Sequence, residues 1–335
     1  MPSGKVLAAL CSALLVGGTL VSCSESRARP EPAVDAVAAP PPSSATVPPA
    51  TAPAPTLAAL PTPRAETVAV PEPGRVAPAA RPEALAARIT AAERVVRDSD
   101  SSNRSVRAAA FELQQLYRQL AGAPRWERRV LAATPPRLRL AVRANVAARQ
   151  EFRAMHTTLS DTLPSWRIID PPRAAQLLSF YRAGEARFGV PWEVLAAVNL
   201  VETGMGRIRG TSVAGAQGPM QFMPATWAAF GRGDVNDPRD AVMAAARYLA
   251  HNGGGRGQID NALYRYNNSW RYVRGVKAYA AVMKDDPAAF RGYYHWQIVY
   301  ASAHGDVWLP TGYVQRESIP VRRYLRANPS HRLTD

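Results

Sequence analysis

Proline, alanine, serine and threonine dominate residues 24–80, and this stretch has no aromatic residue and no lasting hydrophobic periodicity. Because such a segment cannot bury enough apolar surface to offset the entropy lost on folding, we expect it to be disordered. A polyproline rise of ~3.1 Å per residue would let it reach on the order of 100–170 Å when extended. Compact structure is therefore expected only after residue 80.

The residues before this stretch are typical of an export signal. One basic residue, Lys5, precedes an apolar run over residues 6–20 that is too short for a membrane-spanning helix. The run ends in LVSC at residues 20–23, which resembles the bacterial lipobox. That resemblance implies a lipoprotein signal peptide over residues 1–22 and lipidation of Cys23, on the outer face of the cytoplasmic membrane, facing the cell wall. An uncleaved anchor and an ordinary cleaved signal are the alternatives.

Cysteine usage agrees with this interpretation. The chain contains only Cys11 and Cys23. Cys11 would leave with the signal and Cys23 would carry lipid, so the exported part would have no disulfide and would depend on its hydrophobic core. Residues 23–80 would then form a tether that holds a folded domain away from the membrane.

The chain is strongly basic, with a formal net charge of +15 and a pI of about 10.4. Nearly all of the positive charge is arginine. A biased genomic base composition explains this preference, and attraction to a polyanion is the functional alternative. Anionic wall polymers are therefore a further candidate partner beside the membrane, and nucleic acid is not expected.

Three helical patterns follow the tether, over residues 82–100, 104–122 and 135–155, with apolar residues at helical spacing. In the third pattern Leu138, Val142 and Val146 lie on one face. We predict a helical N-terminal extension over residues 81–165, serving either as a support for the main domain or as a basic surface.

The main domain, over residues 166–290, is expected to open with a helix capped by Asp170 and ended by Gly189. A second helix begins at Pro191 and ends at Gly204.

The tail over residues 291–335 alternates in polarity around Gly305-Asp306, which predicts a small β-hairpin. Its aromatic residues, Trp296, Tyr300 and Trp308, are expected mainly to cover the core.

Glu202 is the unusual residue of the second helix. It lies at helical spacing from Leu195 and Val198 and so falls on the apolar stripe. A buried carboxylate is costly unless it is paired or protonated. Two interpretations stay open on spacing alone: a structural role, as an ion pair with Arg207 or Arg209 or as a cap of the loop, and a general acid with a raised proton affinity.

The loop after Glu202 favours a ligand site. Glycines recur along this loop, and they permit tight turns and close approach to a ligand. Gln217 and Gln221 stand among Met220, Phe222 and Met223. An apolar wall with a few amide groups suits an N-acetylated sugar.

Three motifs occur in order: Glu202-Thr203, then GPMQFMP at residues 218–224, then Tyr266-Asn267. Together they resemble the lytic transglycosylase domain of the goose-lysozyme-like superfamily, over residues 172–283. The sequence departs from the usual family pattern at three positions: Thr203 stands for serine, Pro219 for leucine and Arg265 for alanine.

The resemblance implies a mainly α-helical, lysozyme-like fold and a peptidoglycan lytic transglycosylase without a cofactor. In that family a single glutamate protonates the MurNAc–GlcNAc β-1,4 bond and then accepts the proton of the muramyl C6 hydroxyl, which leaves a 1,6-anhydro end. Carried over, Glu202 is the acid and base. The implied substrate-binding residues are Thr203, Met220, Gln221, Phe222, Tyr266 and Asn267, with Gln221 on an acetamide and Tyr266 orienting Glu202 or the reacting sugar.

The acids further along the chain have structural explanations. Asp237 followed by Pro238 is typical of a helix start. Asp234, Asn236 and Asp240 lack the glycine and terminal glutamate of a standard calcium loop, so no metal is expected. Two other functions stay open: a muramidase in which water attacks with Asp234 as second carboxylate, and a non-catalytic wall-binding lipoprotein.

Overall fold

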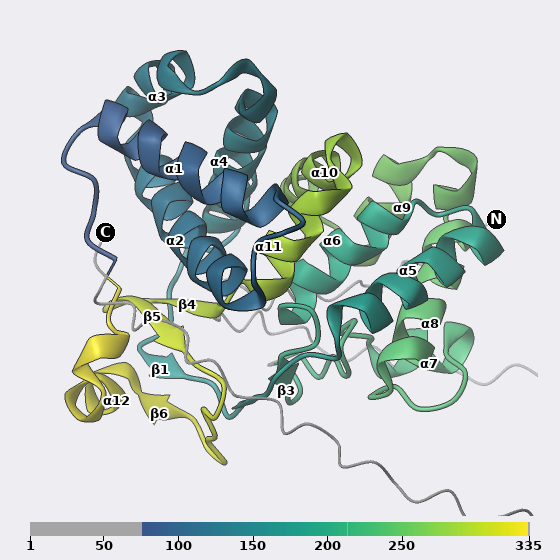
Figure 1. Cartoon of the computed structure of the whole chain (residues 1–335). Helices are drawn as coiled ribbons and strands as arrows, with labels where there is room; N and C mark the ends of the chain where they lie inside the picture. Colours follow the sequence, from purple (N-terminus) through teal and green to yellow (C-terminus); the bar gives the residue numbers. More distant parts are fainter. Residues whose placement is uncertain (1–75, 213, 334–335) are drawn as a thin grey trace, which may run out of the picture. The chain divides into compact units, whose positions relative to one another are not determined.

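The structure is a computed structural model that describes residues 76–212 and 214–333, all of which belong to one compact unit. The predicted signal peptide, Cys23 and almost all of the tether lie outside these residues. Within them the chain forms twelve α-helices and three two-stranded antiparallel sheets, so the predicted mainly α fold is confirmed (Figure 1). None of the helices in this part of the chain is both long and apolar enough to cross a membrane.

The predicted helical extension forms four α-helices. A proline opens α1 and the Ser102 hydroxyl caps α2 by accepting a hydrogen bond from the Ser105 amide. The predicted face of the third pattern is buried, as expected. The elements are α1 (Pro82–Arg97), α2 (Asn103–Gly122), η3 (Pro124–Trp126), α3 (Glu127–Ala133), η4 (Pro136–Leu138) and α4 (Arg139–Ala154).

Seven α-helices follow in the main domain and at its end. They are α5 (Ala174–Phe188), α6 (Trp192–Thr203), α7 (Pro224–Phe230), α8 (Pro238–His251), α9 (Ile259–Asn267), α10 (Trp270–Asp285) and α11 (Phe290–His295), with short 3-10 turns η5 (Gly254–Arg256) and η6 (Pro287–Ala289). Every residue of α6 is buried, and the helix packs against α5, α8 and α10 (Figure 1). This central position explains its apolar sequence.

Most predicted helix ends are confirmed and one is wrong. Gly189 and Gly204 end α5 and α6 in the left-handed conformation, and the Asp237 side chain caps α8. Asp170 does not cap α5, which begins only at Ala174. Two prolines follow Asp170, and a residue before proline is disfavoured in the helical region, so the helix does not begin there. The Asp170 carboxylate instead accepts a hydrogen bond from the Thr311 hydroxyl at 3.2 Å.

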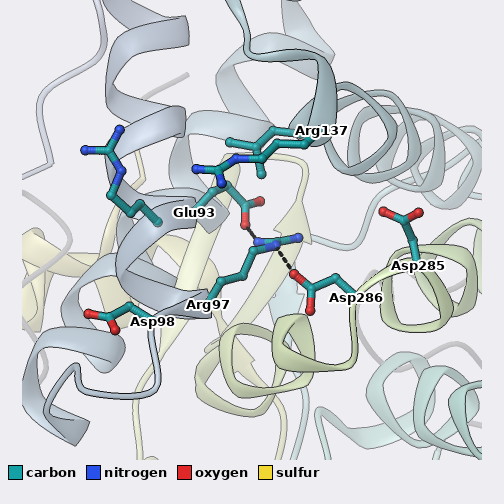
Figure 2. A pocket seen from close by; sticks show the side chains of 8 residues that line it. Glu93, Arg97, Asp98, Arg137, Asp285 and Asp286 are labelled. Atoms are coloured by element: carbon teal, nitrogen blue, oxygen red, sulfur yellow. Dashed lines mark hydrogen bonds and ion pairs between the residues drawn. The ribbon is translucent and has the colours of Figure 1, made fainter.

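One hydrophobic core runs through the extension and the main domain. Phe152 of α4 lies over Gly275 of α10, where a Cβ atom would come within 2.5 Å of the ring. A partly buried group of charges also joins the extension to the main domain: Arg97 of α1 pairs with Glu93 and, at 2.9 Å, with Asp286 at the end of α10 (Figure 2). Packing therefore does not separate residues 81–165 from the part that follows.

A second, smaller core lies under the C-terminal segments. The predicted hairpin is present as β4 (Ile298–Ser302) paired with β5 (Gly305–Leu309). The other elements are β1 (Thr162–Leu163) paired with β6 (Ile319–Pro320), β2 (Arg167–Ile168) paired with β3 (Ile208–Arg209), α12 (Val321–Ala327) and η7 (Pro329–His331). Trp296, Tyr300 and Trp308 are buried, in agreement with their expected core role.

Candidate active site

The last turn of α6 places Glu202 inside the protein, with only 1% of the residue exposed. The helix must end two residues later, because Gly204 adopts a φ of 60°, which favours glycine. A Cβ atom at this position would lie 2.5 Å from Cδ1 of Ile298. Close packing on the β4–β5 hairpin thus fixes the direction in which the chain leaves the carboxyl group.

The Glu202 carboxyl group has one hydrogen-bond partner. Its Oε1 accepts a hydrogen bond from the Tyr272 hydroxyl at 2.7 Å, while Oε2 is buried with no partner among the described residues. The ion pair considered from the sequence is not formed. Arg207 donates to the Tyr294 carbonyl, and Arg209 donates to the Asn236 carbonyl.

Burial raises the pKa of Glu202 well above its ordinary value, and the hydrogen bond from Tyr272 opposes that rise. No neighbouring carboxyl group contributes to this shift among the described residues. The environment therefore favours the protonated, neutral form, as a group that must donate a proton requires. The unpartnered Oε2 is the atom free to carry that proton.

The glutamine loop, residues 217–222, folds into a tight turn. Gln217 and Phe222 exchange backbone hydrogen bonds of 2.9 and 2.8 Å. Gly218 has a φ of 70°, and a Cβ atom there would lie 1.9 Å from the Val235 carbonyl oxygen, so only glycine fits. Gln221 also adopts a positive φ, 50°, which is uncommon for a residue with a side chain. Its amide donates to the Gly218 carbonyl at 2.9 Å. Strain of this kind gathers at functional sites.

Buried side chains of α6 hold this loop beside Glu202. The Pro219 carbonyl accepts hydrogen bonds from the Thr203 hydroxyl at 2.5 Å and from the Asn199 amide at 2.8 Å. The Tyr181 hydroxyl donates to the side-chain oxygen Oδ1 of Asn199 at 2.6 Å. Thr203 is fully buried and holds the loop, so its direct contact with substrate stays a prediction.

Two tyrosines stand in parallel next to the carboxyl group. The rings of Tyr266 and Tyr272 lie 6.4 Å apart with an interplanar angle of 4°. The Tyr266 hydroxyl donates to the Met220 carbonyl at 2.7 Å, and its ring lies 6.2 Å from that of Phe222. The hydrogen bond to Glu202 comes from Tyr272, while Tyr266 holds the glutamine loop. The alternative role predicted for Tyr266, orienting the reacting sugar, stays a prediction.

Residues 179–287 match the family model of the transglycosylase SLT domain. This part of the chain is a transglycosylase SLT domain. It contains Glu202, the glutamine loop and both tyrosines. Comparisons with curated proteins and with solved structures gave no match. The SLT domain supports a lytic transglycosylase-type function that acts on peptidoglycan.

Two of the residues around Glu202 were not predicted from the sequence. Tyr272 lies six residues after Tyr266 and belongs to α10, and none of the three motifs includes it. Asn199 lies one turn before Thr203 on α6, and that i to i+4 spacing was the available signal. Asn267, which was predicted, is buried in the SLT domain, and its side-chain carbonyl oxygen has no partner among the described residues.

Acidic side chains in and beside the loop before α8 form hydrogen bonds with backbone amides of that loop. Asp234 is exposed, and its carboxylate accepts a hydrogen bond from the Asn236 amide at 2.9 Å. The Asp240 carboxylate accepts one from the Asp234 amide at 3.1 Å. Across the described part of the SLT domain and its flanks, no group of three or more His, Cys, Asp or Glu side chains is arranged to hold a metal ion.

Proposed function

We propose that this protein is a peptidoglycan lytic transglycosylase that cleaves the β-1,4 bond between N-acetylmuramic acid and N-acetylglucosamine and leaves 1,6-anhydro-muramyl ends. The observation that carries the proposal is the state of Glu202. This carboxyl group is buried, its pKa is raised by that burial, and its one hydrogen-bond partner within the described structure is Tyr272. Glycosidases that use two carboxylates need a second acid beside the bond, and no acid of the described residues influences Glu202.

In the first step Glu202 donates its proton to the glycosidic oxygen, and the bond from that oxygen to the muramyl C1 breaks. The positive charge that develops at C1 is stabilised by the acetamide of the same sugar. The carboxylate left behind is stabilised by the hydroxyl of Tyr272, which is already aimed at Oε1 at 2.7 Å.

In the second step the muramyl C6 hydroxyl attacks C1. Its proton passes to the Glu202 carboxylate, which restores the starting form of the enzyme. The new C6–O–C1 bond closes the anhydro ring, and no water is consumed. A single carboxyl group can perform both steps because each transfer leaves it ready for the other.

The glutamine loop and Tyr266 would form the sugar-binding wall of this site. Gln221 carries an amide able to meet an acetamide group, and Met220 and Phe222 supply apolar surface. The strained backbone at Gln221 supports this role, since such strain is retained where it positions a functional group. Thr203 and Asn267 would support this wall indirectly. Thr203 would hold the glutamine loop, and Asn267 would hold the end of α9.

The place of action proposed is the outer face of the cytoplasmic membrane. Lipid on Cys23 would anchor the chain, and the proline-rich tether would let the SLT domain reach the wall above. Metabolic lipid labelling of the Cys23→Ala protein tests this anchor, because acylation should be lost.

The substitution Glu202→Gln tests the assignment of the acid. Glutamine keeps the shape of the side chain but neither gives nor takes a proton at neutral pH, so we expect turnover of purified peptidoglycan to fall by several orders of magnitude. The folded structure and the binding of insoluble peptidoglycan should persist. Full activity in the variant would reject Glu202. A wild-type protein that binds peptidoglycan and never cleaves it would favour the wall-binding alternative.

A further inference from the structure

A hollow outside the SLT match has four arginines among its lining residues. Its volume is about 640 Å³, and it lies among the end of α2, η3, the last turns of α4 and the β4–β5 turn. We call it the arginine hollow. Its charged lining residues are Arg118, Arg125, Arg149, Arg153 and Asp306.

The charges of the arginine hollow do not balance. The one acid, Asp306, accepts hydrogen bonds from Arg118 through Nε at 3.1 Å and Nη2 at 2.8 Å. Arg125, Arg149 and Arg153 take part in none of the ion pairs found among the described residues. Three guanidinium groups therefore face this space without a carboxylate of their own.

The pKa of Arg149 reflects the excess of positive charge in the arginine hollow. Burial, together with the nearby charges of Arg118 and Arg153, lowers the pKa of Arg149 to about 10, although Tyr279 and Asp306 partly oppose this shift. The side chain is still a cation at neutral pH, but it is held where its charge is poorly compensated. An anion bound in the hollow would stabilise it, because an opposite charge favours the ionised form.

A second basic hollow of about 490 Å³ lies at the same β-turn. It is lined by His304, Arg322, Leu325, Arg326 and Arg332 and has no acidic lining residue. The Arg332 guanidinium donates to the His304 carbonyl at 2.7 Å, which holds it at the turn. His304 of the β4–β5 turn lines this hollow, while the next two residues, Gly305 and Asp306 at the start of β5, line the arginine hollow. The two hollows thus meet at one end of the β4–β5 hairpin.

The arginine-rich composition alone does not produce such an excess. A third hollow, between α1 and the end of α10, also contains arginines, but Arg97 in it is paired with Glu93 and Asp286 (Figure 2). In that third hollow, acidic lining residues compensate the arginines. In the two hollows at the β4–β5 hairpin, arginines outnumber acidic lining residues.

We propose that the two hollows bind one linear anionic wall polymer, whose repeated phosphate or carboxylate groups meet successive guanidinium groups across the β4–β5 turn. Arginine suits this task because its fork of donors matches both kinds of anion. Two adjacent sites also strengthen the binding of one chain that reaches both. The site goes beyond the proposed cleavage and does not require Glu202.

The same surface is a poor match for a lipid bilayer. Membrane-surface binding combines basic groups with apolar side chains that enter the headgroup region. The exposed large apolar residues in the described part of the chain are Leu140, Trp270 and Val314, and none of them lines either hollow. Trp126, which lines the arginine hollow, is half-buried.

Binding of poly(glycerol phosphate) and poly-L-glutamate to the full chain tests the proposal, with neutral dextran as the blank. The triple variant Arg125→Gln, Arg149→Gln, Arg153→Gln removes the unpaired charges of the arginine hollow. Its matched control removes three exposed arginines that line neither hollow: Arg104→Gln, Arg128→Gln, Arg143→Gln. A thermal melt confirms that each variant is folded.

We expect the hollow variant to weaken binding of a long polymer by roughly tenfold or more, and the control variant to weaken it far less. Arg322→Gln with Arg326→Gln should weaken the long polymer but not the monomer, glycerol phosphate. Glu202→Gln should leave binding unchanged, so a failure of this proposal is distinct from a failure of the catalytic one.

Three results would overturn the proposal. Equal losses in the hollow and control variants would show diffuse attraction to net charge. Equal affinity for monomer and polymer would show a small-anion site. Binding to phosphatidylglycerol vesicles that the hollow variant abolishes, with no binding of either polymer, would assign the surface to the membrane.

Discussion

Tyr272 governs the carboxylate form of Glu202. Its hydroxyl donates to Oε1 at 2.7 Å, and this bond lowers a pKa that burial raises. In Tyr272→Phe the carboxylate formed after proton donation loses its donor, so we expect turnover to fall by about tenfold to a hundredfold, the effect of about 1–3 kcal/mol. The alkaline limb of the kcat/KM profile should move to higher pH.

Tyr266→Phe is the matched control. It removes a hydroxyl from the neighbouring ring but breaks the bond to the Met220 carbonyl instead. We expect slower turnover without a shift in the pH profile. A shift of the same size in both variants would contradict a specific role for Tyr272.

The buried acid also makes stability depend on pH. The pKa of Glu202 is raised by burial above its ordinary value of 4.5, so above pH 4.5 unfolded chains release a proton that folded chains keep. The free energy of unfolding therefore falls as pH rises towards the folded pKa. Glu202→Gln removes this loss, and its melting temperature should exceed that of the wild type by a margin that grows with pH and vanishes below pH 4.5.

Glu151 provides a control of opposite sign. Hydrogen bonds from Arg274 lower its pKa, so it stabilises the fold above its ordinary pKa. Glu151→Gln should lower the melting temperature at neutral pH and converge with the wild type in acid. Parallel melting curves for the wild type and Glu202→Gln at every pH would contradict a buried, protonated Glu202.

At the level of elements, the contact of α4 with α10 connects the extension to the site. Phe152 of α4 fills the space over Gly275 and lies 6.5 Å from the ring of Tyr272. A methyl group in Gly275→Ala would meet the Phe152 ring, so we expect a loss of about 1–3 kcal/mol in the free energy of unfolding, together with lower activity. Adding Phe152→Leu should restore part of the stability.

Gly122→Ala at the end of α2 is the control for that substitution, because a Cβ atom there meets nothing within 4 Å. It should be neutral or slightly stabilising, since alanine favours helix more than glycine does. If Gly275→Ala were equally harmless in chemical denaturation, the close packing of α4 on α10 would be wrong.

Prediction from the sequence succeeded where local rules decide. The face of Leu138 and Val142, the glycine ends of α5 and α6, and the Asp237 cap follow from periodicity and capping chemistry. It failed at Asp170, which was predicted to cap α5, because the two prolines that follow delay the start of the helix to Ala174. It also missed Tyr272, whose role depends on α10 lying beside α6, a contact between segments 70 residues apart that periodicity does not report.

At the level of the whole molecule, the sequence predicted a helical extension before the main domain, either as its support or as a basic surface, and the structure packs both on one core. Composition marks such a boundary, but it cannot show that apolar faces of α1, α2 and α4 are completed by α10 and α11. The order of the three SLT motifs was visible in the chain, whereas their meeting around Glu202 required the fold.

The central claim concerns one carboxyl group that both gives and takes a proton, so the product decides it most directly. We would digest purified peptidoglycan with the wild-type protein and measure the masses of the released fragments. Anhydro-muramyl ends, lighter than hydrolysed ends by one water, are the predicted result, and Glu202→Gln should release none. Reducing ends that carry that water would contradict the account and assign the protein to the muramidases, with Asp234 as the next carboxylate to test.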